Sequence, residues 1–223
     1  MRWCYLVPAF LLATAGFAAT ADDASAAGCR APRNSSDFEV RVDIDTGRPI
    51  VYNQLSKSEL GTSNLHGRNH QILGNTQSGL ELRWSINYQV SNWRNVYCVW
   101  AASADVKLSY QQLDINIARE YLPGSCEYEA VLDHENEHVE VAQRVMRPYA
   151  RQIQQALTSL DIPTARAAAV VNSPEDARTE IEAAFQRTLQ PVRDQLVRAL
   201  KQQQSYVDSP ENYRRTAQRC QNW

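Results

Sequence analysis

The segment CEYEAVLDHENEHVEVAQRVMRPYA, residues 126–150, decides the second half of the fold. Its apolar side chains recur every three to four residues, which is typical of an amphipathic helix that lies on a core. Ser125 precedes it as a suitable N-cap, and Glu127 and Glu129 stand in the first turn, where carboxylates favour the positive end of a helix. The pattern therefore predicts a long helix, which Pro148 bends or splits.

This predicted helix carries an H-E-x-x-H motif, His134-Glu135-Asn136-Glu137-His138. Residues four apart lie on one helix face, so His134 and His138 can bind one Zn²⁺ while Glu135 reaches the water that the metal activates. At about 100° per residue, both histidines fall on the apolar side of the helix. We therefore predict His134 and His138 as zinc ligands. The alternative is a pair of hydrogen-bonded core histidines without a metal.

Two glutamates compete for the role of general base. The string also satisfies the inverted motif H-x-x-E-H through Glu137. Relative to the centre of the apolar stripe, Glu135 is about 40° away and Glu137 about 120° away, toward water. The helix geometry thus favours Glu135 as the catalytic base and places Glu137 on the surface.

The third zinc ligand is less obvious in the sequence. The extended motif with a third histidine is absent, because Arg144 occupies that position. His66 and His70 stand in a polar segment that predicts a surface loop. A second long helix is expected from Ser173-Pro174 to about Gln204, and on it Glu182 is the acid nearest the apolar stripe. We therefore predict Glu182 as the third ligand.

The first half of the chain shows the period of two that is typical of β-strands. Residues 38–44 and 50–52 predict a hairpin, residues 80–90 a strand, and residues 97–100 and 106–110 two further strands. The predicted fold class is α+β, with an antiparallel sheet over residues 37–122 packed against two long helices within residues 123–223. A short third helix is expected from Ser209-Pro210. The whole of residues 37–223 is expected to form one domain.

The N-terminus has the features of a signal peptide over residues 1–21. Arg2 provides the positive start, an apolar run follows, and Ala19-Thr20-Ala21 fits a cleavage site. A cut after Ala26 and a lipoprotein box ending at Cys29 are the alternatives. Residues 22–36 predict a flexible lead-in. We therefore expect an exported protein, periplasmic or extracellular, and no membrane span, since the apolar run is too short to cross a bilayer.

Composition and cysteine content narrow the class of protein. The 223 residues carry 23 basic and 25 acidic side chains without a basic run, which argues against a nucleic-acid partner. Cleavage of the signal peptide leaves four cysteines, an even set that predicts two disulfides with three possible pairings. Cys98 and Cys126 flank the loop that leads to the motif helix, which favours their pairing. Cys29 and Cys220 then pair by elimination.

Three segments resemble one known family, the bacterial predicted secreted Zn-dependent proteases that form domain of unknown function 922. They are Cys98-Val99-Trp100, Cys126-Glu127-Tyr128 and residues 131–139, and the resemblance spans roughly residues 38–157. It implies metal-dependent proteolysis. The expected function is thus a secreted zinc metallopeptidase acting on a peptide or protein substrate. The alternative is a non-catalytic binding or structural protein of the cell envelope with a metal-stabilised fold.

Overall fold

The computed structural model describes residues 29, 35, 37–65, 68–221 and 223. The predicted signal peptide, residues 1–21, lies outside the described residues, and so does most of the predicted lead-in, residues 22–36. No helix in the described part of the chain is long and apolar enough to cross a membrane.

One long strand, β6 (Val96–Ile117), organises the sheet. On one side, β5 (Gly74–Trp93) pairs with it in antiparallel orientation along the whole of β5. On the other side, β1 (Glu39–Asp45) and β2 (Ile50–Tyr52) pair with it in parallel, and β7 (Ala169–Val171) pairs antiparallel. The sheet is therefore mixed, not antiparallel throughout as the sequence predicts.

The predicted hairpin over residues 38–52 is wrong. β1 ends with Asp45 opposite Ser109, and β2 begins with Ile50 opposite Asp114, so the chain continues along β6 without reversing. A tight hairpin turn of type I′ needs positive φ at two consecutive residues. Here Gly47 has a φ of 65°, and its N–H donates to the Asp45 carboxylate at 3.2 Å in a local turn. This turn displaces the strand locally and does not fold it back.

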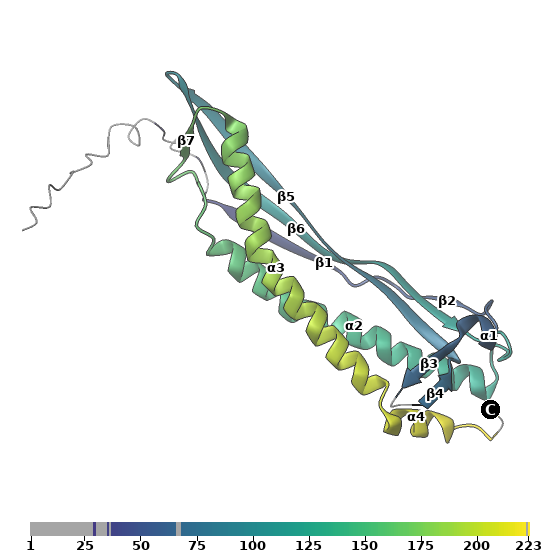
Figure 1. The fold of residues 1–223 in the computed structure, drawn as a ribbon. Helices are drawn as coiled ribbons and strands as arrows, with labels where there is room; N and C mark the ends of the chain where they lie inside the picture. Colours follow the sequence, from purple (N-terminus) through teal and green to yellow (C-terminus); the bar gives the residue numbers. More distant parts are fainter. Residues whose placement is uncertain (1–28, 30–34, 36, 66–67, 222) are drawn as a thin grey trace, which may run out of the picture.

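The two strands predicted at residues 97–100 and 106–110 are one continuous strand, because no glycine or proline interrupts the segment between them. The register of β5 against β6 shifts at Gly79/Leu80 and at Asn87/Tyr88. Such irregularities bend a long ribbon and increase its twist. The ribbon can therefore follow the helices over the length of the molecule (Figure 1).

Two long helices cover one face of this ribbon (Figure 1), as the sequence predicts. They are α2 (Cys126–Thr158) and α3 (Pro174–Val207). The Ser125 side chain accepts the N–H of Tyr128 at 3.2 Å, which confirms the predicted N-cap. Pro148 lies inside α2 without ending it. The connection between the helices is short for their length, so they run antiparallel and the end of α3 lies beside the beginning of α2.

The core runs along the molecule between the sheet and the helices. At the end that includes β7, Phe185 of α3 packs with Ile153 of α2 and Val106 of β6. At the opposite end, Val131 of α2 packs with Ile115 of β6. Burying these side chains is what holds the helices on the ribbon, at roughly 1.5–3 kcal/mol for each large apolar residue. The other fully buried large side chains include Leu108, Met146, Leu157, Ile181, Leu189 and Leu196.

The short elements gather at the end of the molecule where the C-terminus lies (Figure 1). They are α1 (Lys57–Leu60), β3 (Thr62–Leu65), β4 (Arg68–Gln71) and α4 (Pro210–Ala217). The predicted third helix is confirmed as α4, where the Ser209 side chain accepts the N–H of Asn212 at 3.3 Å.

The predicted disulfide pairing is wrong. The bonds are Cys29–Cys98 and Cys126–Cys220. Cys98 lies near the start of β6, and 19 residues separate it from Ile117 at the end of that strand. At about 3.3 Å per residue, this distance is roughly 60 Å. Cys126 follows the far end of β6, so the strand itself holds Cys98 and Cys126 apart.

Candidate metal site

His134 and His138 project from α2 toward the end of α3, where Asp208 is the C-cap residue. Nε2 of His138 lies 3.2 Å from Oδ1 of Asp208, and Nε2 of His134 lies 3.7 Å from the same oxygen. The three side chains form a group that could hold a metal ion, with one ligand atom of each residue within 4.8 Å of the others. The structure thus brings together the two predicted histidines and one acid that the sequence analysis missed.

Gln204 determines which nitrogen of His138 faces this group. Its Nε2 donates to the His138 backbone carbonyl at 3.0 Å, which leaves its Oε1 against Nδ1 of the same histidine. An amide oxygen can only accept, so Nδ1 of His138 carries a proton. When the ring is neutral, Nε2 carries the lone pair on the side of Asp208, where a metal ion between the two could bind it, as in a metal-ligating histidine whose other nitrogen is held by a hydrogen bond.

The electrostatics of the group favour a bound cation. Burial alone would raise the pKa of Asp208, but its contacts with His134, His138 and Tyr213 hold this pKa well below the usual range. Burial favours the neutral form of His138, yet its hydrogen bonds to Asp208 and Gln204 raise its pKa overall. Positive charge is thus stabilised between a carboxylate and two imidazoles. A proton or a metal ion can supply it.

The geometry fits a small tetrahedral ion. With zinc bonds of about 2.0–2.1 Å, two ligand atoms of one tetrahedron lie about 3.3 Å apart. The two separations to Asp208 Oδ1, 3.2 and 3.7 Å, are close to this value. Two imidazoles and one carboxylate are the donor set of catalytic zinc sites, which leave a fourth position for water or substrate. Nδ1 of His134 is buried and has no hydrogen-bond partner among the described residues.

Glu135 lies beside this group and is 4% exposed. The hydroxyl of Thr76, in β5, donates to its Oε2 at 2.8 Å. Burial raises the pKa of Glu135, although both histidines and Thr76 act in the opposite direction. A Cβ on Gly74 would lie 2.5 Å from Val131 Cγ1 and 3.0 Å from Glu135 Oε1, so only glycine lets β5 approach α2 this closely. The close approach brings Thr76 to the carboxylate.

Glu137 has the surface position that the helix geometry predicts. Its side chain is 42% exposed, and its carboxylate accepts from Asn212 at 2.7 Å and from Arg215 at 3.1 Å. Both partners belong to α4. Glu137 therefore attaches α4 to α2 and does not face the metal group.

Glu182, the predicted third ligand, lies away from the histidines and forms hydrogen bonds with β5. Its two carboxylate oxygens accept from Trp84 Nε1 at 3.1 Å and from Tyr88 OH at 3.0 Å, both in β5. It precedes Asp208 by 26 residues, of which all but the last belong to α3. At about 1.5 Å per residue, this places it about 39 Å from Asp208 along the helix. The prediction of Glu182 as a ligand beside His134 and His138 is therefore wrong, and the acid that lies beside them is Asp208.

The antiparallel pairing of the two helices provides a signal that would have narrowed the choice of acid. His134 stands eight residues after the first residue of α2, and the two helices contain 33 and 34 residues. In an antiparallel pair of nearly equal length, the partner of His134 lies about as far from the end of the second helix as His134 does from the start of the first. This partner position, eight residues before Val207, lies between Asp194, which is exposed, and Asp208, the first acid that follows, so helix pairing restricts the choice to these two acids and excludes Glu182.

A cavity of about 640 Å³ contains the site. Its walls are the end of β4 and the beginning of β5 on one side and the end of α3, α4 and Trp223 on the other. His70 lines it from β4 and is exposed, so this histidine belongs to a strand and not to the surface loop that the sequence predicts. His66 lies outside the described residues. The metal group, Glu135 and a space for a ligand therefore coincide.

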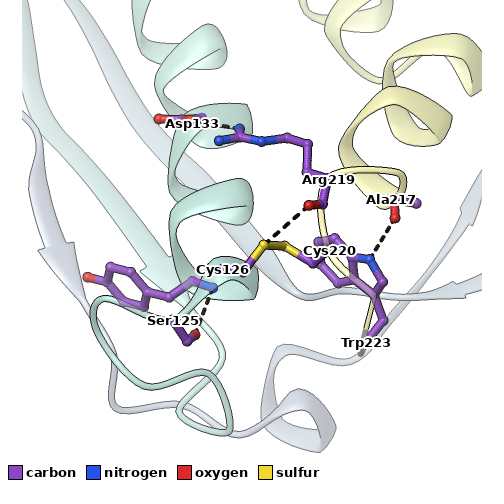
Figure 2. Close-up of a disulfide and its surroundings, with 8 residues drawn as sticks. Ser125, Cys126, Asp133, Ala217, Arg219, Cys220 and Trp223 are labelled. Carbon is purple, nitrogen blue, oxygen red and sulfur yellow. Dashed lines mark hydrogen bonds and ion pairs between the residues drawn. A yellow bond between two sulfur atoms is a disulfide. The ribbon is translucent and has the colours of Figure 1, made fainter.

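The Cys126–Cys220 disulfide joins the beginning of α2 to the segment after α4 (Figure 2). Next to it, Arg219 forms an ion pair with Asp133 at 2.7 Å. α4 also carries Tyr213, whose hydroxyl donates to Asp208 Oδ1 at 2.7 Å. Burial and the neighbouring carboxylate raise the pKa of Tyr213, so its hydroxyl stays protonated as a donor. The disulfide therefore stabilises the segment that orients Asp208.

The two disulfides offer a matched test of this arrangement. They close loops of 94 and 69 residues, for which chain entropy predicts similar stabilisation of about 4–5 kcal/mol each. We expect the double variants Cys126→Ser/Cys220→Ser and Cys29→Ser/Cys98→Ser to lose similar amounts of stability in denaturant titrations. Only the first should weaken zinc binding, by about tenfold, because only that bond lies beside the site. Equal zinc affinity in both double variants would contradict a positioning role.

Comparisons with known proteins leave the family open. No protein-family model matches the chain, and neither a curated protein nor a solved structure matches it. The resemblance to the predicted secreted Zn-dependent proteases therefore stays a prediction, and the site is interpreted from its own geometry.

Proposed function

We propose that this protein is a zinc-dependent hydrolase of peptide bonds, with His134, His138 and Asp208 as the metal ligands and Glu135 as the general base. The observation that carries the proposal is the position of Glu135. A buried carboxylate stands next to three convergent ligands in one cavity that has room for a substrate. A site that only stabilised the fold would need neither the cavity nor the adjacent base.

The roles of the side chains follow from their contacts. Zn²⁺ bound here would act as a Lewis acid on the scissile carbonyl and would lower the pKa of water. Glu135 takes a proton from the attacking water and passes it to the leaving amine. Burial raises the pKa of Glu135 toward neutral pH, and a carboxyl with such a pKa can both accept and return a proton. Thr76 holds one oxygen of this carboxylate, which leaves the other for water.

The two disulfides agree with an exported protein. Two disulfides form and persist in an oxidising compartment such as the periplasm or the extracellular space. Both lie in the described part of the chain, one at each end of the molecule. We therefore place the proposed activity outside the cytoplasm, on peptide or protein substrates.

Metal removal tests the proposal directly. We expect the purified chain to bind about one zinc ion and to cleave an unfolded protein substrate, because the three ligands leave one position open. Treatment with a chelator should abolish cleavage, and one equivalent of zinc should restore it. Metal content by mass spectrometry and cleavage by gel electrophoresis are the measurements. Cleavage that persists at zero metal content would exclude the proposed mechanism.

A further inference from the structure

The cavity of the metal site has an apolar wall. The described residues that line it include Trp223, Ala217 and Val131, together with Ile72 and Leu73. Leu200 lines it as well, from α3. Apolar side chains thus lie around the metal ligands in the space that a substrate would fill.

The same cavity is poor in charge. The described residues that line it include no lysine or arginine, and the only acids are Glu135 and Asp208. Both carboxylates are already engaged, Glu135 with Thr76 and Asp208 with Tyr213 and the histidines. A charged substrate side chain placed here would lose hydration and meet no lysine or arginine and no carboxylate beyond these two among the described lining residues, which makes its burial costly.

A second cavity shows that this lack of charge is specific to the metal site. It has about the same volume, 640 Å³, and lies between α2, α3 and α4. Its lining carries several charged side chains: Glu137, Arg144, Glu211, Arg214 and Arg215. These two cavities therefore differ in the ligands they can hold, and the one whose described lining has no lysine or arginine contains the metal ligands.

Trp223 is the largest apolar side chain in the wall, and its ring is held in place. Its Nε1 donates to the Ala217 carbonyl at 2.7 Å (Figure 2), and its ring meets the Tyr121 ring edge to face at 6.1 Å. The residue is nevertheless 41% exposed. A ring that is fixed by its polar end and open on its apolar surface binds an apolar group at low cost in conformational entropy.

We infer that the cavity selects an uncharged, apolar substrate side chain next to the bond to be cleaved, and that Trp223 is the main selecting residue. The inference rests on the proposed function, because it names the substrate class of the same site. Substrates would then be polypeptides with leucine-like or aromatic residues at the cleavage point. Such residues are accessible in unfolded chains and mostly buried in folded ones.

Two hydroxamates of equal length test the inference on the zinc-loaded full chain. One carries an isobutyl side chain and the other a carboxyethyl side chain, and both bind zinc through the same group. We expect the isobutyl compound to bind about tenfold more tightly or better, measured by isothermal titration calorimetry. Trp223→Ala should reduce this ratio to about threefold or less, whereas Trp223→Phe, which keeps an aromatic ring but loses the hydrogen bond to Ala217, should give a ratio between those of the alanine variant and the wild type. Tyr206→Ala, a loss of an exposed aromatic ring in the other cavity, should leave the ratio unchanged.

The outcomes separate the two proposals. Equal binding of both hydroxamates, tighter binding of the charged one, or no binding of either to the zinc-loaded chain would overturn the inference. Because hydroxamate binding needs no turnover, a chain that shows the expected ratio but cleaves no peptide would disprove hydrolysis and support the cavity's selectivity. A chain that cleaves peptides with glutamate at the cleavage point as fast as those with leucine would support hydrolysis and disprove the inference.

Discussion

Replacing Glu135 by glutamine is expected to lower peptidase activity by about a hundredfold to ten thousandfold while zinc content stays at the wild-type level. Loss of a general base typically costs this much. Glutamine keeps the size of the side chain and an oxygen that accepts from Thr76, so the fold and the metal group should be preserved. Its amide cannot take up a proton. The measurements are kcat/KM on one peptide substrate and metal analysis of both proteins.

Glu137→Gln is the matched control, because it makes the same chemical change two residues away on the same helix. Glu137 is bonded to Asn212 and Arg215 and does not belong to the lining of the metal cavity. We expect the peptidase activity of the Glu137→Gln variant to stay within about twofold of wild type, since loss of a solvent-accessible ion pair has little energetic effect. If Glu137→Gln lost activity and Glu135→Gln kept it, the inverted motif H-x-x-E-H would be the correct interpretation.

Replacing Asp208 by alanine should weaken zinc binding by about two orders of magnitude or more, because it removes one of the three proposed ligands. Asp208 Oδ1 lies within 3.7 Å of Nε2 of both histidines. Tyr213→Phe removes only the hydrogen bond that orients this carboxylate, and we expect a smaller loss of about tenfold to a hundredfold. Competition with a zinc-binding dye gives both affinities, and circular dichroism checks the fold.

Glu182→Ala is the control for this experiment. Glu182 bonds to Trp84 and Tyr88 far along α3, so its loss should lower stability modestly and leave zinc affinity unchanged. Zinc affinity that falls in Glu182→Ala and stays the same in Asp208→Ala would show that the ligand assignment is wrong. The pair of variants therefore decides between the ligand that the sequence predicts and the one that the tertiary structure places at the site.

Local periodicity made part of the site predictable. The helix repeat of 3.6 residues puts His134 and His138 on one face and turns Glu137 away. In the structure Glu135 is buried and Glu137 is partly exposed, on the side of α4. The helix caps Ser125, Ser173 and Ser209 were predictable for the same reason, since each acts within its own turn. In all these cases the interacting residues are close in sequence.

Features that join distant segments were not predictable from local patterns. Strand alternation is the same in a hairpin and in two consecutive strands, so it could not show that β1 and β2 both run parallel to β6. The disulfide pairing depends on β6 being one continuous strand, which separates Cys98 from Cys126 by most of the length of the molecule.

The sequence by itself determined a long amphipathic helix with two inward histidines and a buried glutamate between them, because a helix places residues four apart on one face. Only the tertiary structure decided the third member of the group. The connection between α2 and α3 makes the two helices antiparallel, and their apolar stripes hold both on the ribbon. This packing brings Asp208 to the histidines and Glu182 to the opposite end. Which acid reaches the histidines thus depends on its position along α3, at a rise of about 1.5 Å per residue. No local motif contains this information.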